Sequence, residues 1–385
     1  MTSWLFQPEH DLFRKTVRTF LDREIAPDIE EWEALGQVPR HIFRTVGAQG
    51  YLGVGFPEAD GGLGGDVMAE AVWIEELARL GSGGVGAALS GHTTIGLMPL
   101  GRWANAAQKA RYLRPGIRGD CICALAVTEP DAGSDVASIR TVATEAEGGF
   151  RLNGTKLFIT NGTQADVVVV AAKTRPDLGH RGISLFLVER SQPGFRVGRR
   201  LDKLGWRASD TAELFFDDVL VPADHLLGEP EKGFYYLMEG FQWERITLAL
   251  SAVALAERAL WDALAYSQAR QQFGRALRGF QVIRHHLVDL AVDVEKARQL
   301  TYRALYLYAT EGNAHHEAAM AKAYAGEMAR RVTDGALQVF GGNGYMMDYP
   351  TQRYWRDARV LSIGGGATEV MYEVIANALL NGRDG

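Results

Sequence analysis

The chain has 385 residues, of which 47% are hydrophobic and 23% charged. This is ordinary globular composition, and at roughly 100–200 residues per domain the length indicates two or three domains. Lys and Arg together number 41 and Asp and Glu 47, giving a net charge of −6. That balance argues against nucleic acid as the main partner, because binding phosphates needs a basic surface.

Neither a membrane span nor a secretory leader is expected. Apolar runs such as residues 167–172 are far shorter than the roughly 20 residues that cross a bilayer, and residues 1–14 lack a basic stretch followed by an apolar one. Cys121 and Cys123 have no second Cys/His pair, so no metal site is expected. Two cysteines fit a reducing compartment, which favours a cytoplasmic location.

Residues 1–119 are predicted to form a helical N-terminal domain. Phe13, Val17 and Leu21 recur at helical spacing. Asp66 is placed to cap a further helix, which ends at the glycine-rich residues 81–84.

Residues 120–228 are predicted to form a middle β domain. Short apolar stretches at 167–172, 183–188 and 213–216 read as strands. The pair Asn153-Gly154, between apolar residues, predicts a two-residue hairpin turn. Short strands about ten residues apart suggest a small antiparallel β-barrel or sandwich, and we take the barrel as the prediction.

Long helices return in residues 229–385. Helical patterns cover 234–269, 280–310 and 315–340, and a last helix begins near Thr368. Long apolar-striped helices with short connections indicate an antiparallel four-helix bundle. The predicted fold class is therefore mainly α, with a β domain in the middle.

Glu244 is the first candidate for a catalytic residue. Leu237, Phe241, Leu248 and Leu255 share one helix face, and Glu244 lies on that face within the apolar stripe. Desolvation would raise the pKa of its carboxyl group toward neutrality, which suits a general base. The alternative is a carboxylate at the edge of the stripe that pairs with a nearby Arg or Lys.

Three glycine-containing segments are further candidates, at residues 127–135, 338–344 and 364–369. The first offers hydroxyl and backbone N–H groups in a tight turn, and the third offers free N–H groups at a helix start. Neither glycine-rich break, 338–344 or 364–369, matches a P-loop or a dinucleotide fingerprint. Taken singly, each of the three is equally compatible with a plain turn.

Five motifs in register resemble the acyl-CoA dehydrogenase family of flavoproteins over essentially the whole chain. They are VTEPDAGSD (127–135), NGTKLFITNG (153–162), RQQFG (270–274), QVFGGNGY (338–345) and IGGGATEV (363–370). The resemblance implies a helical domain, a β domain and a helical bundle. It also implies FAD as cofactor and oxidation of an acyl thioester to its trans-2-enoyl form, with flavin N5 accepting the β-hydride.

The resemblance also implies positions that bind the cofactor. Those expected to hold the FAD of the same subunit are Leu125, Val127, Thr128, Ser134, Phe158, Thr160, Thr368 and Glu369. Those expected to hold the FAD of a neighbouring subunit are Arg270, Phe273, Gln281, Gln338, Gly341 and Gly342. The second group implies a homo-oligomer, with a tetramer built as a dimer of dimers as the expectation.

The chain departs from many relatives at Gly365, where they carry the catalytic glutamate. It resembles the isovaleryl-CoA and long-chain branches, which place the base at the position of Glu244, so Glu244 is the expected catalytic residue. Gly365 would still offer its N–H to the thioester oxygen, and Gly364 would widen the acyl pocket for branched or bulky chains. The positions expected to contact substrate are Ser134, Gln242, Arg245, Gly365 and Gly366.

The function expected from this resemblance is acyl-CoA dehydrogenation, with electrons passing to an electron-transferring flavoprotein. One alternative is a dehydrogenase of an acyl group bound to a carrier protein. A second is an oxygen-using relative, of which an acyl-CoA oxidase fits better than a flavin monooxygenase. A flavin-free, non-catalytic binding protein is the alternative from another class.

Overall fold

A computed structural model describes residues 4–381, and its N-terminal part is helical. Asp66 caps helix α4 (Val67–Arg79) as predicted, since its side chain accepts a hydrogen bond of 2.8 Å from the backbone N–H of Ala69. The helices are α1 (Pro8–Glu24), α2 (Ile29–Leu35), α3 (Arg40–Ala48), α4 (Val67–Arg79), α5 (Gly83–Ser90), a π-helical segment (Gly91–Leu97), α6 (Met98–Trp103), α7 (Ala106–Gln108), a second π-helical segment (Lys109–Leu113) and α8 (Arg114–Ile117).

The middle part is a β-sheet whose strand order is β6-β7-β3-β2-β4-β5-β8, with β1 beside β4. Most pairs are antiparallel, whereas β1 and β2 run parallel to β4. The strands are β1 (Cys123–Ala126), β2 (Val142–Ala146), β3 (Gly149–Thr160), β4 (Val167–Lys173), β5 (Ile183–Glu189), β6 (Phe195–Arg200), β7 (Thr211–Pro222) and β8 (Leu226–Leu227).

The hairpin turn predicted at Asn153-Gly154 is wrong. Both residues lie inside β3, which pairs with β7 along its whole length and is shifted in register at this point. Glycine is needed here because a Cβ atom on Gly154 would lie 2.4 Å from Oγ1 of Thr141. The turn between β2 and β3 instead contains Gly148, at a φ of +83°. Long-range strand pairing thus overrides the local turn signal.

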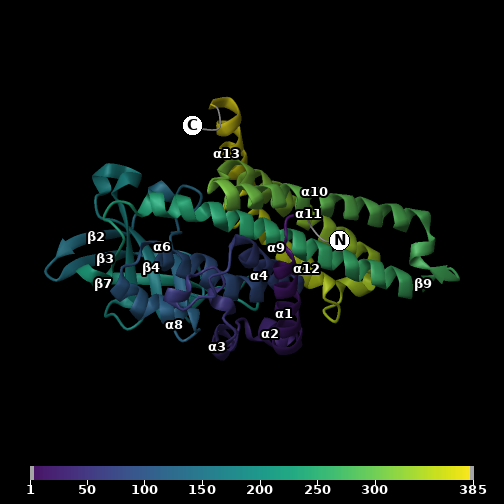
Figure 1. The fold of residues 1–385 in the computed structure, drawn as a ribbon, viewed down its shortest axis with the longest axis horizontal. Coiled ribbons are helices and arrows are strands. Elements are labelled where there is room, and N and C mark those ends of the chain that lie inside the picture. The colour runs from purple at the N-terminus through teal and green to yellow at the C-terminus, as the bar shows by residue number, and fades with distance from the viewer. Residues whose placement is uncertain (1–3, 382–385) are drawn as a thin grey trace.

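The C-terminal part is a helical bundle close to the prediction. Its long helices are α9 (Gly233–Ala269), α10 (Gln281–Glu311), α11 (His315–Phe340) and α13 (Thr368–Asn381). The short helix α12 (Thr351–Ala358) and the small hairpin β9–β10 (Gln271–Gln272 and Arg275–Ala276) were not predicted. Figure 1 shows the β domain beside one end of α9 and β9 at the other end, with α13 projecting from the body.

Helix α9 is the element that joins the three parts. It packs against α4 of the N-terminal part, against β5, and against α10 and α11 of the bundle. Its buried face is rich in alanine, as at Ala249, Ala252 and Ala256, which lets neighbouring helices approach closely. Side chains on α9 can therefore meet residues from all three parts of the chain.

Candidate active site

Glu244 lies on α9 against a turn made of three glycines, Gly364, Gly365 and Gly366. A Cβ atom on Gly365 would lie 3.2 Å from Oε1 of Glu244 and 2.2 Å from Cδ1 of Leu248. Gly365 also has a φ of +62°, which favours glycine. The Glu244 carboxylate therefore faces the glycine turn, at a distance where a side chain on residue 365 would meet it.

Burial raises the pKa of the Glu244 carboxyl group, and the positive charges of Arg245 and Lys322 offset this rise only in part. Within residues 4–381 the Glu244 carboxylate forms no ion pair. The structure therefore does not support the alternative in which Glu244 lies at the edge of the stripe and pairs with an Arg or Lys. Burial likewise lowers the pKa of Arg245, whose Nε has no hydrogen-bond partner in the described part. A buried guanidinium N–H without a hydrogen bond, next to a desolvated carboxylate, lowers the stability of the folded protein when no ligand is bound.

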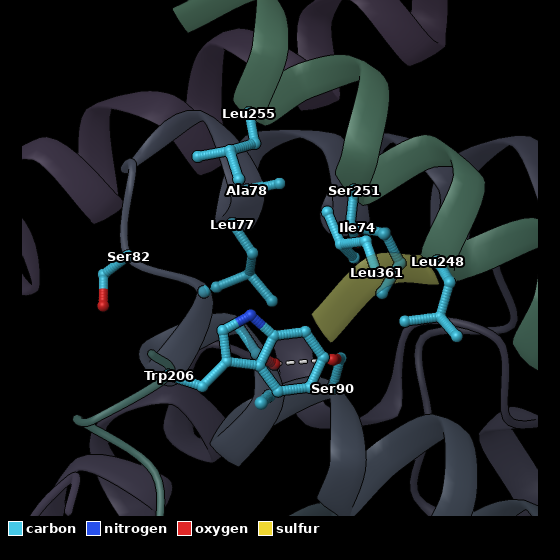
Figure 2. Close-up of a pocket in the computed structure, with 13 residues that line it drawn as sticks. Ile74, Leu77, Ala78, Ser82, Ser90, Trp206, Leu248, Ser251, Leu255 and Leu361 are labelled. Atoms are coloured by element: carbon cyan, nitrogen blue, oxygen red, sulfur yellow. Dashed lines mark hydrogen bonds between the residues drawn. The ribbon is translucent and has the colours of Figure 1, made fainter. Parts of the chain in front are cut away.

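An apolar pocket opens at Leu248, one helical turn from Glu244, and Figure 2 shows lining side chains pointing inward from α4, α5 and α9. Leu248, which touches Gly365, is part of this lining. The pocket has an empty volume of about 480 Å³, including the part that opens to solvent. It is lined by Ile74, Leu77, Ala78, Ser82, Gly83, Gly86, Ala87, Ser90, Trp206, Leu248, Ser251, Leu255 and Leu361.

The predicted stripe on α9 is unevenly buried. Leu237 and Leu255 are buried, whereas Phe241, Glu244 and Leu248 stay partly exposed. Of these residues, Leu248 and Leu255 line the pocket. Sequence reasoning identified the stripe but missed the pocket residues of α4, α5 and Trp206. The spacing of small residues in α5, at Gly83, Gly86, Ala87 and Ser90, was the signal that could have found them.

Two predicted segments of the β domain come together. The N–H of Leu157 donates a hydrogen bond of 2.8 Å to the carbonyl of Thr128. The buried Lys156 donates to the carbonyl of Val127 at 2.9 Å and to Glu129 at 2.8 Å. This pairing fixes Thr128 beside the bulge at Phe158, where φ is +62° and the ring is 63% exposed.

Other predicted positions of the β domain lie at its accessible surface. Leu125 and Thr160 are partly exposed and Ser134 is exposed. Thr160 lies near the pocket, because a Cβ atom on Gly91, the residue after Ser90, would be 3.2 Å from Cγ2 of Thr160. The aromatic ring, the two threonines and the pocket therefore belong to one region.

The remaining predicted cofactor positions form a separate group at the far end of the bundle, near β9 (Figure 1). Arg270 follows Glu244 by 26 residues, or about 39 Å along the helix axis. Phe273 is 92% exposed, a high value for so large an apolar ring. The exposed members of this group are Arg270, Phe273, Gln281, Gln338, Gly341 and Gly342. Within a single chain, these six positions therefore lie far from Glu244.

Gln242 does not join the region around Glu244. It is buried at 3% exposure, and its Oε1 accepts a hydrogen bond of 2.5 Å from the N–H of Ala314 at the start of α11. Two residues of helix rotate its side chain by about 200° from Glu244. The expected substrate contact is thus replaced by a structural bond.

Thr368 and Glu369 start α13 directly after the glycine turn, with Thr368 buried and Glu369 exposed.

Residues 4–381 contain no group of three or more His, Cys, Asp or Glu side chains placed to hold a metal ion. In the same part of the chain, none of the helices is both long and apolar enough to cross a bilayer.

Comparison with known families matches the chain in three consecutive segments. The acyl-CoA dehydrogenase N-terminal domain matches residues 7–120, the middle domain residues 124–219 and the C-terminal domain residues 231–380. The chain therefore belongs to the acyl-CoA dehydrogenase family, whose members are FAD-dependent oxidoreductases that dehydrogenate acyl-CoA thioesters.

Individual relatives are similar along almost their whole length. An acyl-CoA dehydrogenase of Bacillus subtilis is 41% identical over 97% of this chain and 98% of its own. The mitochondrial long-chain specific acyl-CoA dehydrogenase of Mus musculus is 40% identical over 98% of this chain and 88% of its own.

Solved structures show the same fold. Butyryl-CoA dehydrogenase from Megasphaera elsdenii has a TM-score of 0.94 at 38% identity, covering 98% of this chain and 100% of its own. A chain from work on the electron transferring flavoprotein of Acidaminococcus fermentans has a TM-score of 0.95 at 38% identity, covering 98% and 100%. The FAD complex of PigA has a TM-score of 0.94 at 29% identity, covering 99% and 100%.

The residues present fit FAD, the cofactor of the family. The exposed Phe158 ring at the bulge can stack on a planar ring system, and the partly exposed Thr128 and Thr160 offer hydroxyl groups. The glycine turn leaves its backbone accessible between Glu244 and the start of α13. This chemistry suits a flavin between the β domain and the bundle.

Proposed function

We propose that this family member oxidises an acyl-CoA thioester with Glu244 as the base that removes the α-proton. The observation that carries the proposal is a carboxylate with a raised pKa and no ion-pair partner that faces Gly365, with Leu248 of the apolar pocket against the same glycine. An α-proton next to a thioester is weakly acidic, so its removal needs a base of raised pKa and a donor for the developing oxyanion. Glu244 supplies the first and the N–H of Gly365 the second.

The cofactor would be held by residues from two chains. Bound FAD supplies the acceptor for the β-hydride. We assign Leu125, Val127, Thr128, Ser134, Phe158, Thr160, Thr368 and Glu369 to the FAD of the same subunit, and Arg270, Phe273, Gln281, Gln338, Gly341 and Gly342 to that of a neighbour. The distance of about 39 Å along α9 supports this division, since it separates Arg270 from Glu244 within one chain.

The substrate proposed is an acyl-CoA with a medium or long chain. Leu255 lines the pocket 11 residues beyond Glu244, which is about 16 Å along α9. A Cβ atom on Gly364 would meet only Val360, at 3.7 Å, so this side of the turn leaves room for branched chains. Arg245, Ser134 and Gly366 remain the proposed contacts to the thioester and its carrier.

We further propose a homotetramer that passes electrons to an electron-transferring flavoprotein, with domains divided at residues 119/120 and 228/229. A carrier-protein thioester as substrate and oxygen as acceptor are the alternatives. They are separated by comparing turnover of CoA and carrier-protein thioesters and by measuring hydrogen peroxide in air.

The test is anaerobic bleaching of the flavin absorbance by a panel of acyl-CoA thioesters. The wild type is expected to bleach, and Glu244→Gln is expected to keep its FAD but lose bleaching by at least 100-fold in rate. Glu257→Gln, a partly exposed glutamate on the same helix, serves as the control and should bleach normally. Normal bleaching by Glu244→Gln would overturn the assignment of the base.

A further inference from the structure

Lys322 is a buried cation next to the site, and the proposed mechanism gives this residue no role. It lies on α11, its side chain is 1% exposed, and it is among the largest fully buried side chains of the described chain. Burying a lysine is costly unless its ammonium group is bonded. Its Nζ donates a hydrogen bond to the carbonyl of Gly366, in the turn that Glu244 faces.

The same face of α11 holds the segment before the turn. Gly326 lies one helical turn after Lys322, and a Cβ atom there would be 2.7 Å from the carbonyl oxygen of Leu361. Backbone contact at Gly326 and the hydrogen bond from Lys322 therefore fix residues 361–366 at two points. Three consecutive glycines lose much conformational entropy when ordered, so the turn needs such an external anchor.

Lys322 also acts on Glu244 through its charge. Glu244 is influenced by Arg245 from its own helix and by Lys322 from α11, both of which favour its ionised form. Lys322 in turn is influenced by Glu244 and Arg245 from α9, by Glu369 from α13 and by Glu327 from α11. Its ammonium group thus links the base to the turn that faces it.

We propose that Lys322 is a positioning residue that holds the Gly364–Gly366 turn in the conformation in which the N–H of Gly365 meets the thioester oxygen. The inference rests on the proposed function. It predicts two separable effects of removing the ammonium group: a looser turn and a base that ionises at higher pH.

The test compares the holoenzymes of wild type, Lys322→Met and Lys322→Arg. Met keeps the length of the side chain without a donor or charge, whereas Arg keeps both. Hydrogen–deuterium exchange of residues 361–368 reports the turn directly and does not depend on catalysis. The pH dependence of kcat reports the base, because the rate falls as Glu244 becomes protonated. Lys296→Met, at a solvent-exposed lysine of α10, is the matched control.

For Lys322→Met we expect faster exchange in residues 361–368, a kcat lower by about tenfold, and an acid limb shifted to higher pH by about one unit. Lys322→Arg should restore the acid limb, and Lys296→Met should match the wild type. A purely structural lysine would lower thermal stability but leave the acid limb in place.

Unchanged exchange together with an unchanged acid limb in Lys322→Met would overturn the inference. Should that variant fail to fold, Lys322→Gln is measured in the same way. A failure of the proposed function is seen separately, as normal bleaching by Glu244→Gln, and leaves the exchange result to decide the role of Lys322 in the turn.

Discussion

Substitution of Gly86 tests whether the pocket beside Glu244 holds the acyl chain. Gly86 lies on α5 and lines the pocket, and a Cβ atom built on it would have no heavy atom within 4 Å. The first of the four carbons that Gly86→Leu adds therefore lies in open space at the pocket lining rather than in packed protein. These carbons occupy the volume of about four substrate methylenes, each of which contributes roughly 0.8 kcal/mol when buried.

The expected loss is thus about 3 kcal/mol, or roughly 100-fold in kcat/KM, for chains that reach Gly86. Shorter chains should be unaffected. Gly86→Ala adds one carbon, so it should cost such chains about fourfold. It should also raise the melting temperature, because alanine in a helix interior is more stable than glycine by up to about 1 kcal/mol.

The assay is kcat/KM over saturated acyl-CoA thioesters of increasing length, with thermal unfolding measured in parallel. An equal loss for all chain lengths, or no loss for the longest, would refute the assignment of this pocket to the acyl chain.

Three further outcomes are expected. Glu244→Gln should raise the melting temperature at neutral pH, with the gain disappearing in acid, because a carboxyl group whose pKa is raised in the folded state destabilises the fold once it is ionised. Lys156→Met should lower the free energy of unfolding by about 3–5 kcal/mol in denaturant titrations, since it removes the ammonium group that balances the charge of the buried Glu129 carboxylate. Phe273→Ala should weaken subunit association in analytical ultracentrifugation and promote FAD loss on dilution, with the isolated fold retained; unchanged association would contradict the shared site.

The elements that sequence predicted best are those set by local periodicity. The pattern at 315–340 coincides with α11, and α9 and α10 begin and end within one residue of their predicted bounds. Asp66 caps α4 because the capping interaction spans only three residues. The predicted turn at Asn153-Gly154 failed because the partner that keeps β3 extended, strand β7, lies some 60 residues away in the chain.

The candidate site likewise has features that the sequence predicted and features that depend on tertiary packing. The apolar stripe placed Glu244 on an inward face, and five motifs indicated the family and its cofactor. The stripe gave no sign that Leu248 would stay partly open to a pocket, because that depends on how α4 and α5 pack around α9. Gln242 was expected at the substrate but bonds to Ala314, a contact between residues 72 positions apart.

Helix periods, caps and motif order are properties of neighbouring residues, so the sequence alone determined the order of helical and β segments, the family and the carboxylate candidate. The pocket, the anchoring of the glycine turn by Lys322 and the separation of two groups of cofactor positions depend on which distant segments meet. Only the tertiary structure decided these features, because close packing assigns each side chain its neighbours without regard to their distance along the chain.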